Sequence, residues 1–151
     1  MFKTSIKYSF ACEKTEVHFK EALMQLSDRF ESEDNKTIYA GRNVLKVIDH
    51  NNKKTVVKSF KELGLIRRCI YTFFRASKAQ RSFEHSMILK ERNIGTPTPI
   101  AYINYYKAGL IKQSYYACDF IDYDFEFRDL NDQHFDDLAE ILKACASFVT
   151  D

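Results

Sequence analysis

A lysine at position 58 and a glutamate at position 84 are the two residues of this 151-residue chain whose types and spacing suggest chemistry. Lys58 follows two valines in a β-branched run at residues 55–60, which is typical of a strand. Glu84 lies 26 residues later in a segment with helical periodicity. A strand lysine can neutralise phosphate groups while a helix glutamate orients it. The pair therefore suggests a nucleotide-binding lobe.

The neighbours of Lys58 sharpen this interpretation. Alternate side chains of a strand share one face, so Val56, Lys58 and Phe60 are expected to point the same way. An ammonium group between two apolar side chains needs an anion, which a phosphate would supply, and Val56 would then contact an adenine. For the strand taken alone, an edge lysine with its head group in water is the favoured explanation.

Glu84 is expected at the border of the apolar face of a helix at residues 78–92, beside Phe83, Met87 and Ile88. A carboxylate in such a position is costly unless it is paired. Lys58 would relieve that cost and be held in place by the same contact. Arg81 and Lys90 are the alternative partners on the helix itself.

A turn that could hold phosphate groups is expected at Gly41, Arg42 and Asn43, between two extended segments. The glycine would allow a tight turn, and the backbone N–H groups of Arg42 and Asn43 would face phosphate oxygens together with the Arg42 guanidinium. The segment has one glycine where a full phosphate-binding loop has three. An ordinary hairpin turn accounts for the same residues.

The order of the expected elements gives an α+β fold. Five segments are expected to form an antiparallel sheet, at residues 37–40, 44–49, 55–60, 100–105 and 114–120. A helical stretch at residues 65–93, broken near residues 75–77, is inserted after the third strand. This is the plan of a protein-kinase-like amino-terminal lobe, although other α+β domains share parts of it.

Further elements are expected at both ends of the chain. A strand at residues 2–10 and an amphipathic helix at residues 16–30 belong to an extension at residues 1–34, before a sheet and helix at residues 35–121. Residues 1–121 would thus form one lobe. Residues 122–151 would be an acidic connector followed by an amphipathic helix that begins at Asn131 or Asp132.

Composition excludes several classes of protein. With 45% hydrophobic and 29% charged residues, the chain is expected to fold, and it has neither an apolar run of membrane-spanning length nor a signal-peptide core at its start. We therefore expect a cytoplasmic location. A pI near 8.3 and an acidic second half argue against a nucleic-acid groove.

The net charge of +2 conceals two segments of opposite sign. Residues 61–81 carry six basic residues against one acid, and residues 119–140 carry nine acids against one base. Solvated surfaces explain both segments, as would a charged partner or pairing between them.

Within the first segment, a helix around residues 65–74 has an apolar and aromatic stripe on one side and basic residues on the other, namely Arg67, Arg68 and Arg75. Such a helix suits an anionic membrane surface. Packing of its stripe on the sheet is the alternative.

The sequence resembles the lipopolysaccharide kinase family, the Kdo and heptose kinases of Gram-negative bacteria, and especially its Bacteroidetes-type members. The resemblance covers roughly residues 35–125, and its motifs are the segments at residues 41–43, 56–60, 71–84 and 94–103. It implies a kinase-like fold in which Lys58 contacts ATP phosphates and Glu84 holds the lysine. It also implies that the segment from Cys118 through Asp119 and Phe120 to Ile121 is a hinge whose backbone meets adenine.

The same resemblance implies a second lobe with a catalytic aspartate, an asparagine and a metal-binding aspartate, none of which stands here in a recognisable context. We therefore expect an ATP-binding portion that does not transfer phosphate alone, binds ATP weakly or not at all, and would hold Mg²⁺ only with that lobe. Asp129, Asp136 and Asp137 are explained by a helix start rather than by catalysis. A lipid A–core sugar would be the acceptor, reached by peripheral attachment at the inner membrane. A non-enzymatic half-kinase that binds a partner or itself is the alternative.

Overall fold

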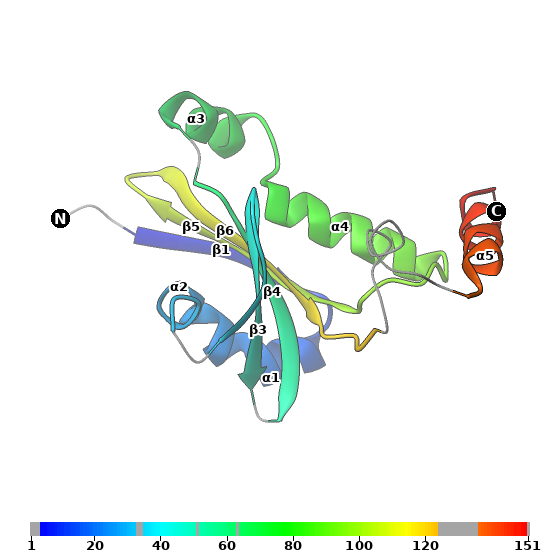
Figure 1. Ribbon diagram of the computed structural model, residues 1–151. Coiled ribbons are helices and arrows are strands. Elements are labelled where there is room, and N and C mark those ends of the chain that lie inside the picture. Colours follow the sequence, from blue (N-terminus) through cyan, green and yellow to red (C-terminus); the bar gives the residue numbers. More distant parts are fainter. Residues whose placement is uncertain (1–3, 33–34, 51, 63, 124–135, 151) are drawn as a thin grey trace. The chain divides into compact units, whose positions relative to one another are not determined.

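The computed structural model describes residues 4–32, 35–50, 52–62, 64–123 and 136–150 (Figure 1). The chain divides into two compact units, residues 1–120 and residues 121–151. The expected helix start at Asn131 or Asp132 and the acid at Asp129 lie outside the described residues.

A six-stranded antiparallel sheet forms the centre of the first unit (Figure 1). Its strands are β1 (Thr4–Phe10), β2 (Lys36–Ala40), β3 (Asn43–His50), β4 (Lys53–Phe60), β5 (Pro99–Lys107) and β6 (Leu110–Asp119). They follow the order β1-β5-β6-β4-β3-β2 across the sheet. The strand of Lys58 therefore lies in the interior of the sheet, between β3 and β6.

The α+β class is confirmed, but the expected number of five strands is wrong. The amino-terminal segment is a strand, as its alternation predicts, and β1 adds to the sheet along β5, from Thr4 opposite Lys107 to Phe10 opposite Ala101. An uncovered β5 would leave a row of backbone groups without partners, and β1 satisfies them. Strands β2–β6 keep the order of three strands, a helical segment and two strands.

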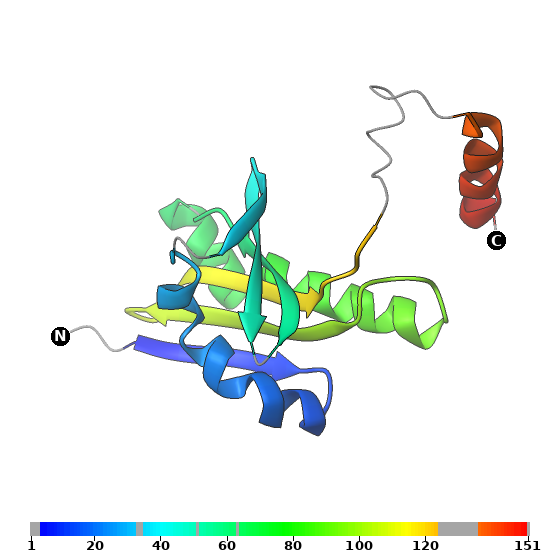
Figure 2. The same cartoon turned by 60° about the horizontal axis from the view of Figure 1, so that its bottom comes forward.

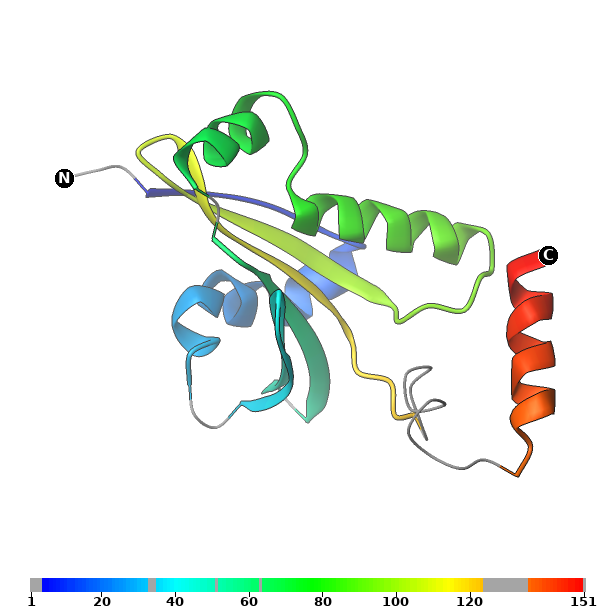
Figure 3. The same cartoon turned by 45° about the horizontal axis from the view of Figure 1, so that its top comes forward.

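Helices lie on both faces of the sheet (Figure 3). The first unit contains α1 (Glu13–Met24), α2 (Leu26–Arg29), α3 (Leu65–Phe73) and α4 (Lys78–Glu91), and the second unit contains α5 (Leu138–Thr150). Helices α1 and α2 cover one face of the sheet and α4 covers the other (Figures 2 and 3). The single helix expected at residues 16–30 is thus two helices.

The end of α1 is bound by a tyrosine of the sheet. The Tyr105 hydroxyl donates to the carbonyl groups of Leu23 and Met24, at 3.2 and 3.0 Å, which gives these last carbonyl groups of the helix a hydrogen-bond partner.

Two apolar clusters hold these layers together. The first lies between the sheet and α1–α2 and includes Phe19, Leu26 and Val57. The second lies between the sheet and α4, where Phe83 packs with residues of β4, β5 and β6, among them Phe60. Successive residues of β4 therefore divide between the two clusters, as strand geometry requires. Lys58 consequently points to the same side of the sheet as α4.

A side-chain cap explains where α4 begins, and positive φ values explain the turn between β5 and β6. The Ser77 hydroxyl accepts a hydrogen bond from the Gln80 N–H at 3.0 Å, which starts α4 and accounts for the break expected near residues 75–77. Between β5 and β6, Ala108 and Gly109 have φ values of 53° and 77°. Positive φ at both positions is the conformation of a two-residue hairpin turn whose twist matches the flanking strands.

Candidate functional site

Lys58 lies half-buried on the α4 side of the sheet, opposite Leu45 of β3 and Tyr116 of β6. Its Nζ atom is 5.3 Å from the centre of the Phe60 ring. Burial raises the pKa of the neighbouring Cys118 thiol to about 11, and the charge of Lys58 opposes that rise. Cys118 is therefore a neutral thiol near pH 7 and does not act as a counter-ion for Lys58.

Helix α4 packs chiefly on β5 and β6, so the half of this face formed by β2, β3 and β4 is more open. Leu45, Val47, Val56 and Lys58 lie on this open half, and all four are half-buried. We call these four residues the Lys58 face. An apolar surface with one ammonium group can receive a flat apolar ring together with an anion.

Glu84 does not form the expected ion pair with Lys58. Its side chain is exposed, and its Oε1 atom accepts a hydrogen bond of 2.8 Å from the Gln80 side chain. Burial raises the pKa of Tyr102 on β5, and the negative charge of Glu84 adds to that rise. In the part of the chain that the structure describes, ion pairs join Lys20 to Glu16 and Lys53 to Asp119 instead.

The turn expected to hold phosphates lies at the end of the Lys58 face. Gly41 and Arg42 connect β2 to β3, while Asn43 is the first residue of β3 and pairs with Phe60. A β-carbon on Gly41 would lie 2.5 Å from the Tyr39 hydroxyl oxygen and 2.8 Å from the adjacent ring carbon. The Tyr39 ring therefore lies against Gly41, but as the far end of an exposed side chain it can move aside, so the contact does not by itself require a glycine. The Gly41 N–H donates to the Asn43 carbonyl at 3.0 Å, so this donor is already engaged.

The expected hinge spans the end of β6, whose last two residues are Cys118 and Asp119. The Asp119 N–H donates to the Thr98 carbonyl at 2.9 Å, and the Phe120 N–H donates to the Lys54 carbonyl at 3.2 Å. Asp119 pairs with Thr55, so its side chain lies on the side of α1, where it meets Lys53 at 3.0 Å. Any contact of Asp119 with a ligand on the Lys58 face would therefore have to come from its carbonyl group. Ile121 belongs to the second unit.

The structure of the basic helix α3 differs from the alternative in which its apolar stripe packs on the sheet and its arginines are solvated. Arg68 is not a solvated arginine, because its Nε atom donates to the Ile111 carbonyl at 2.7 Å. Arg67 and Arg75 are exposed, and the Arg75 guanidinium lies 5.8 Å from the centre of the Tyr71 ring. The apolar stripe is not packed on the sheet, since α3 has no buried residue. The sequence pattern revealed this stripe but not the direction in which it faces.

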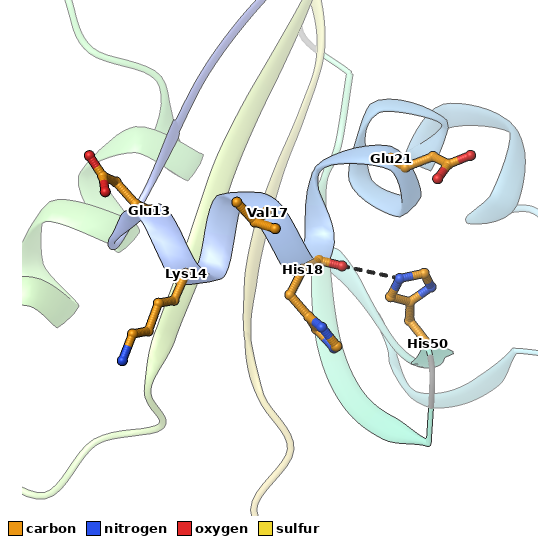
Figure 4. Close-up of a pocket in the computed structure, with 6 residues that line it drawn as sticks. All are labelled: Glu13, Lys14, Val17, His18, Glu21 and His50. Carbon is orange, nitrogen blue, oxygen red and sulfur yellow. Dashed lines mark hydrogen bonds between the residues drawn. The ribbon is translucent and has the colours of Figure 1, made fainter.

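A separate hollow of about 700 Å³ lies between α1 and the end of β3, outside any of the expected sites (Figure 4). It is lined by Glu13, Lys14, Val17, His18, Glu21 and His50. The His50 Nε2 atom lies 3.2 Å from the His18 carbonyl oxygen. The hollow is open and its charges are mixed in sign, which gives no preference for one kind of ligand.

The described residues contain no group of three or more histidine, cysteine or acidic side chains placed to hold a metal ion. None of the helices within the described ranges has both the length and the apolar character needed to span a bilayer. Comparisons with known proteins gave no match among family models, curated proteins or solved structures.

Proposed function

We propose that the chain is the ATP-binding amino-terminal portion of a lipopolysaccharide-kinase-like phosphotransferase, and that it does not transfer phosphate alone. Its parent reaction would move the terminal phosphoryl group of ATP to a lipid A–core sugar. The resemblance in sequence motivates this proposal. The observation that carries it is the order of groups along β4.

That order matches the order of groups along a nucleotide. The turn at Gly41 and Arg42 lies beyond Phe60, Lys58 follows one step inward on the same face, and Val56 follows one step further. Each step spans about 7 Å, the repeat of two residues in a strand. Val56 lies opposite Cys118, the first residue of the expected hinge. Phosphates at the turn and Lys58 would thus place an adenine over Val56.

The charge around Lys58 supports the same orientation. Lys58 makes no ion pair within the described residues, so a half-buried ammonium group on an apolar face is available to an anion. Glu84 stands on the helix that covers the same side of the sheet. In this proposal Glu84 leaves Gln80 and pairs with Lys58 when a nucleotide is present.

Binding of Mg·ATP to the whole chain tests the proposal. Ligand-observed NMR should detect binding with a dissociation constant near the millimolar range, because one lobe provides only one wall of the cleft. Lys58→Met should weaken it at least about tenfold, since hydrogen bonds to a charged group contribute about 1.5–3 kcal/mol. Lys14→Met, which removes an exposed lysine from α1, is the matched control and should bind as the wild type does.

Equal ATP binding by the wild type and Lys58→Met would contradict a role for Lys58. Titration calorimetry that gave a micromolar dissociation constant for Mg·ATP would contradict the expectation that this lobe alone binds the nucleotide weakly. An assay with Mg·ATP and a phosphosugar acceptor should give no product. Turnover that disappeared in Lys58→Ala would show instead that the chain is catalytically complete.

A further inference from the structure

Helix α3 is attached to the sheet by its polar side. The Thr72 hydroxyl accepts a hydrogen bond from the Ile111 N–H at 3.0 Å and donates to the Arg68 carbonyl at 2.7 Å. Arg68 in turn donates to the Ile111 carbonyl at 2.7 Å. Both backbone groups of one residue of β6 are therefore bound by the polar face of α3. This is the reverse of the usual arrangement, in which an amphipathic helix packs its apolar face on the protein.

The apolar side of α3 consequently faces solvent. Ile66 is 79% exposed, Phe73 is 69% exposed and Phe74, directly after the helix, is 85% exposed. We call this surface the outward face of α3, and its large apolar residues are Leu65, Ile66, Ile70, Phe73 and Phe74. A contiguous group of side chains of this size normally marks a binding surface.

The charges in the chain segment that carries the outward face are almost all positive. Helix α3 contains two arginines and no acidic residue. Arg67 is exposed on the helix, Arg75 is exposed just beyond it, and Lys61 is exposed before it. Glu62 is the single acid between residues 61 and 81. An apolar face with a basic border is complementary to a surface that is apolar inside and anionic at its rim.

We propose that α3 binds in the headgroup region of a bilayer that contains anionic lipids, with its outward face inserted about 5–10 Å toward the acyl chains. Nine residues of helix are about 14 Å long, which suits a helix lying in the plane of the interface. A second copy of the chain is a poorer occupant, because two outward faces in contact would bring the basic borders of both copies together. The inference is independent of nucleotide binding.

Flotation of the whole chain with vesicles tests this proposal. The protein should float with vesicles of phosphatidylglycerol and phosphatidylcholine, and much less with phosphatidylcholine alone. Ile66→Ser combined with Phe73→Ser should lower the partition coefficient at least about tenfold, because two large apolar side chains no longer enter the bilayer. Arg67→Gln should lower it about fivefold on the anionic vesicles and hardly at all on the neutral ones.

Val17→Ser is the matched control for the apolar substitutions. Val17 is 86% exposed on α1, so the substitution removes an equally accessible apolar side chain from another part of the same unit. It should leave flotation unchanged, and circular dichroism should show that all variants are folded. Protein that stays in solution with both kinds of vesicle would overturn the proposal. So would equal flotation of the wild type and the Ile66→Ser, Phe73→Ser variant, or sedimentation showing a dimer that this variant dissociates.

Discussion

The Tyr116 hydroxyl donates a hydrogen bond of 2.8 Å to the Ser86 hydroxyl and thereby joins β6 to α4. Ser86 passes the interaction on, because its hydroxyl donates to the Ser82 carbonyl one turn earlier at 2.9 Å. Tyr116 is also the strand partner of Lys58. This hydrogen bond therefore helps to fix the position of α4 relative to β6. It thereby also helps to fix the position of Glu84 relative to the strand that carries Lys58.

Removing either hydroxyl should destabilise the first unit. Tyr116→Phe should lower the free energy of unfolding by about 0.5–1.5 kcal/mol, and Ser86→Ala by about 1–3 kcal/mol, because the buried Tyr116 hydroxyl then loses its partner. The double variant should cost clearly less than the sum of the single ones. Urea unfolding of all four proteins measures this coupling. Strict additivity would show that the two hydroxyls do not interact.

Stability should also fall at high pH. Burial raises the pKa of Tyr115 and of Tyr116 well above the ordinary value of 10.0. Both phenols therefore stay protonated in the folded chain at pH values where an unfolded chain has lost these protons. The unfolded state then binds fewer protons, so the free energy of unfolding decreases as the pH rises from about 10 toward the folded pKa. Urea unfolding at pH 8, 10 and 11 measures the slope.

The variant Tyr116→Phe provides the control for the pH effect. Without the phenol at position 116, the decrease between pH 10 and pH 11 should be smaller than in the wild type, whereas the values near pH 8 should differ only by the lost hydrogen bond. An identical slope in both proteins would assign the effect to other groups, among them Tyr105, whose pKa is also raised by burial.

The hairpin between β5 and β6 should be open to stabilisation. Ala108 adopts a φ of 53°, a conformation that glycine and asparagine reach more easily than alanine does. Ala108→Gly should therefore raise the free energy of unfolding by up to about 1 kcal/mol, and Ala108→Asn should act in the same direction. Gly109→Ala, at a φ of 77°, should lower it. Thermal unfolding of the three variants decides whether the turn has this geometry.

Sequence patterns predicted the strands better than the contacts between elements. The alternation at residues 55–60 correctly assigned Val56, Lys58 and Phe60 to one face, because strand geometry alone determines it. The apolar stripe of α3 could not be oriented in the same way. Periodicity shows that a helix has two different faces. Here the hydrogen bond that Arg68 donates to the Ile111 carbonyl and the one that Thr72 accepts from the Ile111 N–H decide which face meets the sheet.

Sequence reasoning missed the place of β1 in the sheet and the hydrogen bond between Glu84 and Gln80 for a related cause. Pairing of β1 with β5 joins segments about 100 residues apart, and no local pattern encodes which edge an isolated strand will cover. Glu84 had several possible partners within reach, and Gln80, one turn earlier on the same helix face, satisfies it without the ordering of a longer contact.

Glu84 should therefore affect nucleotide binding but not stability. Glu84→Gln keeps the size of an exposed side chain and should change the free energy of unfolding by no more than about 0.5 kcal/mol. If Glu84 turns to Lys58 when ATP is present, the same substitution should weaken ATP binding about three- to tenfold. Combined with Lys58→Met, it should add little, because the lysine that Glu84 would orient is gone. Ligand-observed NMR titrations of the four proteins measure the coupling, and full additivity would place Glu84 outside the site.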